Sequence, residues 1–478
     1  MFETMLILPI AIAFILLILQ KIRKKTNYDD SASKLPPVIP ISYLEFLKRV
    51  TSGQLPQSVL EWHRRFGYPV FYTPGIFGRG HFAIVADSEL MREILMDQSS
   101  TKPGFYKRTE NLTGTKTMFS ENGSRWMHAR KSIAYAFSSS HVKRMNEVTV
   151  KHTTEFMEVL DNLQQQNKSF DIGKAMIQLT LKIICEAAFE FDMDISDQST
   201  FLRELEIVLL ENRNGIIPLR WMFGYLFPKV RRQHVGTKRL AALGRKILEA
   251  YKNLQNPIPG TVIDCIVRDE SYNNDEERIA DIIILLVAGH DTTAYSLAWM
   301  FLDLAKHEEE QNKLRSSLKA AGDFQERLQV PRLHYVIKEG MRLHPVAPIG
   351  GMRLCNRDYH YVVEKSDTKV QYKIPEGTVT ALSSLCVLRS HAYFDEPDRF
   401  LPDRWRDPSD IASRAFFPFI VGKRSCIGQP LANAEIQTIL STLILKYSWS
   451  VEDMGTDTFF TTYKPIGAML KASKIVSN

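Results

Sequence analysis

The sequence predicts one large domain that contains long helices and short strands, preceded by an N-terminal transmembrane helix. The chain has 478 residues and no Gly/Ser-rich linker, low-complexity tract or internal repeat that would divide it, although one domain per ~150 residues is the usual prior. An uninterrupted apolar run occupies residues 5–19, and a helical pattern with an apolar centre occupies residues 275–306. We therefore expect one extensive core behind a terminal apolar segment.

The apolar run at Met5–Leu19 is preceded only by Glu3, and its basic residues follow it at 21–25. A cleaved signal peptide carries its positive charges before the run, so an anchor is favoured and a signal peptide is the alternative. Counted from Met1, the run reaches the lower limit of ~17 residues for a membrane span. The basic flank predicts that the rest of the chain is cytosolic, and a thin bilayer such as the endoplasmic reticulum suits a short span.

A proline-rich connector follows at residues 34–40 (KLPPVIP). Proline fixes φ and stiffens such segments. We expect an anchor at 1–20, a basic flank and hinge at 21–40, and the main domain at 41–478. Strand-like segments follow at Pro69–Thr73 and Phe82–Ala86, and another at Tyr372–Leu382 contains a turn.

Charge and cysteine content exclude some classes of protein. The net charge of +7 is spread along the chain, whereas a nucleic-acid-binding protein would show a concentrated basic stripe. A mild basic excess suits an acidic protein partner or a membrane surface. The cysteines are odd in number and form no CxxC pair, which argues against a disulfide framework or a zinc cluster and for a reducing compartment. They stand at Cys185, Cys265, Cys355, Cys386 and Cys426.

The most informative stretch is residues 417–430 (FPFIVGKRSCIGQP). Gly422 and Gly428 bracket Cys426 and allow tight turns and close approach of the backbone to a flat ligand. Pro430 opens a helical pattern, and backbone N–H groups at a helix N-terminus favour a thiolate. Arg424 is placed to pair with an acidic edge of a cofactor.

This stretch resembles the haem-binding signature of the cytochrome P450 superfamily, Phe-x-x-Gly-x-Arg-x-Cys-x-Gly. Every fixed position is present at the right spacing, namely Phe419, Gly422, Arg424, Cys426 and Gly428. The resemblance implies haem b as cofactor, Cys426 as axial ligand of its iron and Phe419 packed near the sulfur. A thiolate ligand pushes electron density onto iron and favours O–O cleavage.

The resemblance covers the chain from the proline hinge to the C-terminus. It implies the cytochrome P450 fold, mainly α with a small β region, as a single large domain plus an N-terminal transmembrane helix. It also implies the membrane-anchored eukaryotic microsomal type. The expected location is a single pass through the endoplasmic reticulum membrane, with residues 41–478 as a cytosolic catalytic domain.

A second motif lies in the long helical pattern Asp275–Lys306, where residues 288–293 read AGHDTT. Gly289 and two threonines are poor helix formers, and a threonine hydroxyl can bond a carbonyl one turn back. We expect the glycine to let a cofactor or O2 approach the backbone. The hexapeptide is similar to the family's oxygen-activation motif, which implies that Asp291 and Thr292 deliver protons, the acid reaching solvent and the hydroxyl lying beside the oxygen. His290 is expected to pack or to face solvent.

Further residues match the family's haem-edge and scaffold motifs. Trp126 and Arg130 match a Trp-x-x-x-Arg helix whose residues reach a haem propionate, and Arg353 fits a further propionate-binding arginine. Guanidinium groups suit this task because they hold carboxylates bidentately. The scaffold residues are expected to form a buried network with a structural role, made by Glu339, Arg342 and Arg404, with Asp403 standing where the family has glutamate.

Partners follow from the same resemblance. It implies O2, a lipophilic small-molecule substrate and NADPH-cytochrome P450 reductase, with no nucleic acid. Ile216–Val230 is apolar and aromatic, and it is expected either to dip into the membrane or to form a core helix. Four basic residues near the haem-edge motifs could dock an acidic flavin reductase, and scattered surface charge is the alternative. They are Arg125, Lys131, Arg414 and Lys423.

Three functions are compatible with these motifs. The first is a monooxygenase that uses O2 and NADPH, the second a haem-thiolate isomerase or dehydratase acting on a peroxide, and the third a non-enzymatic haem binder. The pair Asp291–Thr292 favours the first, since peroxide rearrangement needs no proton relay. The segments expected to contact substrate, Phe105–Met118 and Phe201–Phe227, carry no pattern that identifies it.

Overall fold

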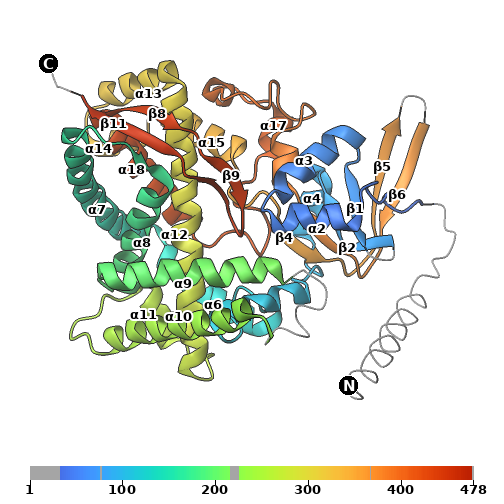
Figure 1. The fold of residues 1–478 in the computed structure, drawn as a ribbon, viewed down its shortest axis with the longest axis horizontal. Coiled ribbons are helices and arrows are strands. Elements are labelled where there is room, and N and C mark those ends of the chain that lie inside the picture. The colour runs from blue at the N-terminus through green and yellow to red at the C-terminus, as the bar shows by residue number, and fades with distance from the viewer. Residues whose placement is uncertain (1–32, 76–77, 216–225, 366–367, 476–478) are drawn as a thin grey trace, which may run out of the picture. The chain divides into compact units, whose positions relative to one another are not determined.

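The computed structural model describes residues 33–75, 78–215, 226–365 and 368–475 (Figure 1). The expected anchor at 1–20 and most of the basic flank lie outside the described residues. The chain divides into a main unit, residues 36–359 with 374–478, and a small unit, residues 1–35 with 360–373.

The main unit is mainly helical (Figure 1). Its helices up to the centre of the chain are α2 (Tyr43–Thr51), α3 (Leu55–Phe66), α4 (Ser88–Met96), η1 (Gly104–Thr109), α5 (Glu110–Thr113), α6 (Gly123–Ala134), η2 (Tyr135–Phe137), α7 (Ser139–Gln165), α8 (Ile172–Phe189), α9 (Ile195–Asn214), α10 (Pro228–Lys252) and α11 (Val262–Arg268). Those that follow are α12 (Asp275–Lys306), α13 (Glu308–Ala320), α14 (Phe324–Leu328), α15 (Pro331–Leu343), α16 (Ser384–Leu388), η4 (Pro402–Trp405), α17 (Asp410–Ala415) and α18 (Gln429–Lys446).

Three small sheets accompany these helices. The first has the order β1-β2-β7-β4, the second β3-β11-β8, and the third is the hairpin β9-β10. Their strands are β1 (Val70–Gly75), β2 (Gly78–Val85), β3 (Phe170–Asp171), β4 (Gly350–Leu354), β7 (Val379–Leu382), β8 (Tyr447–Asp453), β9 (Thr456–Phe459), β10 (Tyr463–Ile466) and β11 (Met469–Lys474). β1 and β2 are antiparallel and β2 and β7 parallel, which confirms the strand-like segments identified in the sequence.

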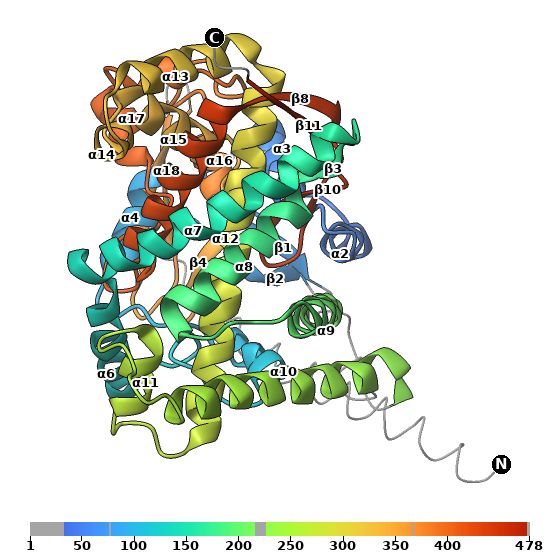
Figure 2. The ribbon, with the colours of Figure 1, turned by 90° about the vertical axis from the view of Figure 1, so that its left-hand side faces the viewer.

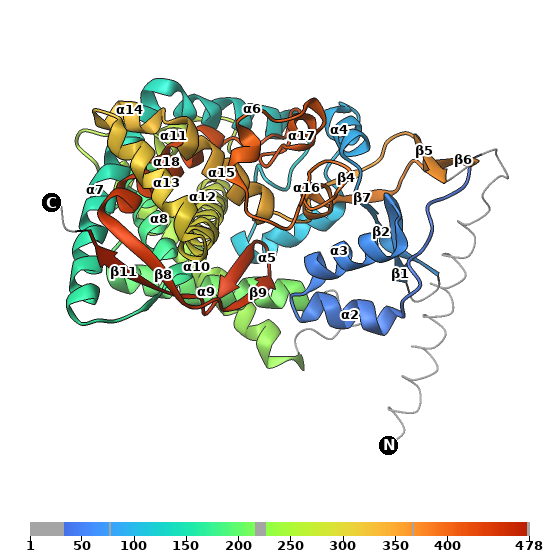
Figure 3. The same cartoon turned by 90° about the horizontal axis from the view of Figure 1, so that it is seen from above.

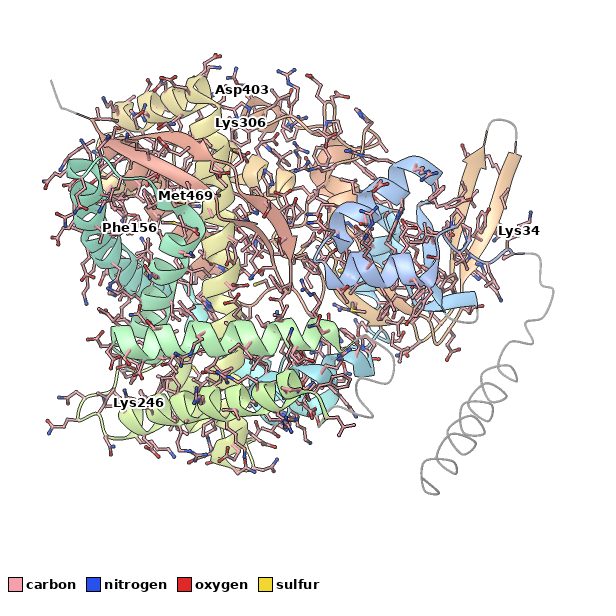
Figure 4. All side chains as sticks on the ribbon, in the orientation of Figure 1. Lys34, Phe156, Lys246, Lys306, Asp403 and Met469 are labelled. Atoms are coloured by element: carbon pink, nitrogen blue, oxygen red, sulfur yellow. The ribbon has the colours of Figure 1, made fainter. Side chains whose placement is uncertain are left out.

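α12 runs through the centre of the main unit and packs against α8, α10 and α18 (Figures 2 and 3). It begins at the predicted residue because Asn274 caps it, its side chain accepting from the Glu277 N–H, and its acidic first turn suits the helix dipole. Lys306 marks its other end (Figure 4). In the part of the chain that the structure describes, α12 is the one helix long and apolar enough to cross a membrane, but 78% of its apolar window is buried inside the fold. It is therefore a core helix.

The predicted scaffold network is confirmed. Glu339 and Arg342 are fully buried, and the guanidinium donates to both carboxylate oxygens at 2.9 Å. Arg404 Nε and Trp405 Nε1 donate to the same carboxylate at 3.1 and 2.9 Å. α15 is thereby joined to η4, which leads toward the cysteine loop. Arg399, five residues before Arg404, pairs with Glu396 and not with Glu339.

The small unit contains the antiparallel pair β5 (Tyr359–Lys365) and β6 (Thr368–Ile374). The backbone of Lys34 bonds to both neighbours of Tyr372 in β6, accepting from Lys373 N–H and donating to the Gln371 carbonyl, each at 2.9 Å. Lys34, the second residue that the structure describes, is therefore tied to this hairpin.

Candidate functional site

The loop that carries Cys426 is shaped by two residues with left-handed backbone, Ile420 (φ 52°) and Gly422 (φ 82°). A Cβ on Gly422 would lie 2.4 Å from the Leu95 carbonyl oxygen at the end of α4, so only glycine fits there. The Cys426 N–H donates to the Phe419 carbonyl at 2.9 Å and closes the loop. Gly422 thus serves a close approach of two backbone segments.

Cys426 presents its sulfur at the N-terminus of α18. The N–H groups of Gly428 and Gln429 point at the sulfur, and they and the Arg130 guanidinium favour the thiolate, whereas burial raises the pKa of the thiol. The side chain is nevertheless accessible. The other cysteines are buried, and burial raises the pKa of the thiols of Cys185, Cys265, Cys355 and Cys386.

The middle of α12 has one accessible stripe. Ala288 is exposed and Leu285, Gly289 and Thr292 are partly exposed, while the other faces of this stretch are buried. The spacing i, i+3, i+4 and i+7 places these residues on one helical face. On this accessible face, the Thr292 hydroxyl donates to the Ala288 carbonyl at 2.9 Å, as the motif predicted.

Gly289 lies on the accessible face and also serves a helix contact that the sequence did not predict. A Cβ at this position would lie 2.9 Å from Cγ1 of Ile184 on α8. The glycine therefore allows α8 and α12 to pack closely, and the expected approach of a cofactor or O2 to its backbone stays a prediction.

The prediction that Asp291 reaches solvent is wrong for this structure, because its side chain is only 6% exposed. Thr462 Oγ1 donates to one carboxylate oxygen at 2.5 Å, and Lys464 Nζ lies 3.9 Å from the other. Both partners come from the C-terminal hairpin, 171 residues or more along the chain. They satisfy the charge of Asp291 inside the fold.

His290 packs, which agrees with the sequence analysis. It is fully buried, its Nδ1 lies 2.7 Å from the Leu286 carbonyl oxygen, and its ring lies edge to face with Phe201. Burial lowers the pKa of the imidazole, so the ring is neutral at pH 7.

The predicted haem-edge residues converge beside the cysteine loop. The Arg424 guanidinium lies 3.5 Å above the Trp126 ring and donates to the Glu121 carbonyl at 2.8 Å. Arg130, one turn along α6 from Trp126, donates to the Ser425 carbonyl at 2.7 Å. These contacts hold α6 against the loop.

A cluster of four cations, hereafter the cation cluster, forms at this place. Burial and repulsion by Arg353 and Arg130 lower the pKa of Arg424 to about 10. Burial, and then repulsion by the three arginines, lowers the pKa of Lys102 well below its usual value. The members are Lys102, Arg130, Arg353 and Arg424.

No carboxylate of the described residues forms an ion pair with the cation cluster, and two of its buried nitrogens, Arg353 Nη2 and Arg424 Nη1, have no hydrogen-bond partner. Buried cations without counter-charges are costly. The cluster therefore fits a ligand with an acidic edge, and a flat cofactor carrying two carboxylates beside an accessible cysteine matches it. Haem has this composition.

Lys102 was missed by the sequence analysis. It lies between α4 and η1, where its ammonium group lies 3.6 Å from the Phe119 ring centroid and donates to the Phe119 carbonyl. The local sequence Thr-Lys-Pro-Gly carries no motif. Only its proximity to three arginines distant in sequence reveals it.

Phe419, the remaining residue of the haem-binding signature, is half-buried against the main core. It accepts the Cys426 N–H through its backbone carbonyl.

Two of the four proposed docking residues have acidic partners within the chain. Arg125 lies 3.0 Å from Glu277, and Arg414 donates to Glu89 at 2.8 Å. Arg125 is therefore not available to a docking face.

Of the segment Ile216–Val230, residues 216–225 lie outside the described part of the structure. Leu226 and Phe227 are exposed, and α10 begins at Pro228. The described end of this segment is therefore not a core helix.

Comparison with known proteins identifies the family. The family model described as Cytochrome P450 matches residues 35–476. The chain is 25% identical over 410 residues to "Probable cytochrome P450 508C1" of Dictyostelium discoideum, covering 79% of this chain and 80% of the relative. It is 28% identical over 380 residues to "Cytochrome P450-like protein L532" of Acanthamoeba polyphaga mimivirus, covering 78% and 77%. Human "Cytochrome P450 4F8" is 25% identical over 376 residues, covering 72% and 70%.

A solved structure shares the fold. The crystal structure of a cytochrome P450 designated CYP102L1 superposes with a TM-score of 0.72 at 21% identity, covering 88% of this chain and 98% of that one. A single family model that spans nearly the whole chain thus agrees with the helical architecture. The chain belongs to the cytochrome P450 family, whose members are monooxygenases that bind haem iron through a cysteine thiolate and take electrons from a redox partner.

Proposed function

We propose that this chain inserts one oxygen atom from O2 into a lipophilic substrate, with Cys426 as the axial ligand of the haem iron. The observation that carries the proposal is an accessible sulfur at the N-terminus of α18 beside four cations without counter-charges. The haem supplies the redox chemistry when bound.

The cation cluster would hold the two propionates. Arg424 and Arg353 each have one buried nitrogen free to donate, and Arg130 is oriented by the Ser425 carbonyl. Trp126 supports Arg424 through its ring face. Lys102 is added to the set predicted from motifs, since its charge is unbalanced without an anion.

Thr292 and Asp291 would move protons. The Thr292 hydroxyl lies on the accessible face of α12 and can exchange its bond to the Ala288 carbonyl for one to a water or a ligand. Asp291 is held by Thr462 and Lys464, so a carboxylate that exchanges protons with solvent must first loosen these contacts. The C-terminal hairpin is therefore part of the proton machinery in this proposal.

Electrons would come from NADPH through a flavin-containing NADPH-cytochrome P450 reductase. Lys131 on α6 and Lys423 in the cysteine loop are exposed and could contact its acidic surface. The apolar run and its basic flank support an anchor at 1–20 in the endoplasmic reticulum membrane, a hinge at 21–40 and a cytosolic catalytic domain at 41–478. Exposed Leu226 and Phe227 support a second membrane contact near α10.

The test begins with the CO complex of the reduced protein. A thiolate ligand gives the strongly red-shifted main band of the family, and Cys426→Ser should abolish it while Cys386→Ser, at a buried cysteine, should not. Retention of the band in Cys426→Ser would refute the ligand assignment. NADPH consumption and oxygenated product with reductase and a panel of lipophilic compounds distinguish a monooxygenase from a peroxide isomerase, which turns over without reductase, and from a haem binder, which does not turn over.

A further inference from the structure

The turn of the C-terminal hairpin places one aromatic ring between two cations. Phe460 follows β9, and its ring centroid lies 4.4 Å from Arg213 Cζ and 5.2 Å from Lys464 Nζ. Lys464 has a carboxylate partner, since its Nζ lies 3.9 Å from Asp291. Among the described residues, no carboxylate lies within ion-pair distance of Arg213.

Arg213 stands on the last turn of α9 and is partly buried. Burial lowers the pKa of its guanidinium, and no acid counteracts this effect. Within the described ranges the guanidinium makes no hydrogen bond or ion pair, and its buried Nε has no acceptor. Residues 216–225, which follow it in the chain, contain no Asp or Glu.

A helix C-terminus alone does not explain this arginine. A cation there is usually stabilised by bonding the last carbonyls. At α9 that task is done by Arg108, which donates to the Asn212 carbonyl at 3.1 Å. The Arg213 guanidinium points instead toward the loop between α2 and α3, where a Cβ on Gly53 would lie 2.9 Å from its Nη1 and 3.1 Å from the Phe459 carbonyl oxygen.

This place is linked to the reaction centre by direct contacts. Arg213 contacts Phe460, the Phe460 ring contacts Lys464, and Lys464 faces Asp291 on α12. The loop between α2 and α3 is fixed to the same hairpin, because Phe459 N–H donates to the Gly53 carbonyl at 2.8 Å. A group bound at Arg213 therefore lies against the hairpin that holds the acid of the proton relay.

We propose that Arg213 binds the carboxylate of an otherwise apolar, chain-like substrate. A guanidinium with a free Nε–H pairs with a carboxylate through two parallel hydrogen bonds. One carboxylate balances the one unpaired charge, whereas a phosphate dianion would leave a negative charge uncompensated at a partly buried place. The adjacent Phe460 ring offers an apolar surface to the rest of the molecule. This inference rests on the proposed monooxygenase function and names the substrate class.

The experiment measures the affinity of the haem-loaded full chain for dodecanoic and hexadecanoic acid and for dodecan-1-ol and hexadecan-1-ol, by spectral titration and by calorimetry. We expect each acid to bind more tightly than the alcohol of equal length. Arg213→Gln should weaken acid binding about 10- to 100-fold, as for the loss of one charge-assisted pair, and should leave alcohol binding unchanged. Arg213→Lys should fall between the two.

Arg203→Gln is the matched control. Arg203 lies on the same helix, and its partner Glu204 keeps Arg232 and Arg239, so the variant should bind all four compounds as the wild type does. Equal affinity of the wild type for acids and alcohols, absence of acid binding, or an equal loss of acid and alcohol affinity in Arg213→Gln would each overturn the inference. Failure of the proposed function is separate, because it would appear as a missing thiolate band in the CO complex of the wild type.

Discussion

Two groups of basic residues in the main unit show opposite electrostatic designs. On α9 and α10, three arginines surround the fully buried carboxylate of Glu204, and Arg232 and Arg239 reach it at 2.6 and 2.8 Å. Beside Cys426, four cations converge on no carboxylate. The Glu204 group is complete within the chain and is structural. The cation cluster lacks a counter-charge among the described residues, and this missing charge indicates that an anionic ligand binds there. The sequence motifs alone identify only which positions belong to the site.

The largest expected effect is a loss of stability when the carboxylate of the Glu204 group is removed. Glu204→Gln removes the shared charge of three arginines and should lower the free energy of unfolding by about 1–3 kcal/mol, less than the ~3–5 of fully buried pairs because the arginines are half-exposed. Urea denaturation measures this, with the exposed Glu249→Gln on α10 as control. Haem content should not change. A stability equal to that of the wild type would show that the arginines do not need Glu204.

The same group predicts a pH dependence. The arginines hold the pKa of Glu204 at about 2, below the ~4.3 of an unfolded chain. The stabilisation is therefore fully present above that unfolded value and is lost as pH falls toward 2. Urea midpoints between pH 6 and pH 3 should fall less steeply in Glu204→Gln than in the wild type, and parallel curves would contradict the ion-pair interpretation.

In the cation cluster, removal of a charge should have the opposite effect on the haem-free protein. Lys102→Met relieves repulsion by three arginines and should stabilise the haem-free chain by about 1 kcal/mol, while weakening haem retention about tenfold. Transfer of haem to a scavenger protein and thermal denaturation give the two readouts. Lys107→Met, at an exposed lysine of η1, is the control. Weaker haem retention together with a less stable haem-free chain would mean that Lys102 is structural.

A third buried group, Glu435 on α18, has no cation beside it and sharpens the comparison. It is hydrogen-bonded to Thr293, and burial raises the pKa of its carboxyl to about 8. The folded state keeps the proton that the unfolded state releases near pH ~4.3, so stability should fall as pH rises from about 5 to 8. Glu435→Gln should remove this slope with little change at pH 5. If haem-loaded Glu435→Gln and haem-loaded wild type showed the same dependence of stability on pH, Glu435 would be ionised in the folded protein.

Local motifs were sufficient for much of the site. The loop of Cys426, the helix of Trp126 and Arg130 and the bounds of α12 follow from residues within a few positions of one another, where spacing along the chain dictates spacing in space. The Glu339–Arg342–Arg404 network also followed, since its members belong to two recognisable motifs. The three strand-like segments that were predicted lie within a few residues of β1, of β2, and of β6 with β7, whereas the other strands were not predicted.

Contacts between distant segments were not accessible in this way. The sequence by itself determined the family, the cysteine and the bounds of α12, because these depend on short-range backbone geometry and on residue types at fixed spacing. Only the tertiary structure decided that Lys102 joins three arginines, that Thr462 and Lys464 bind Asp291, and that Gly289 serves the contact with Ile184. Charge pairing and close packing depend on distances in space, and residues far apart in the chain carry no local sign of meeting.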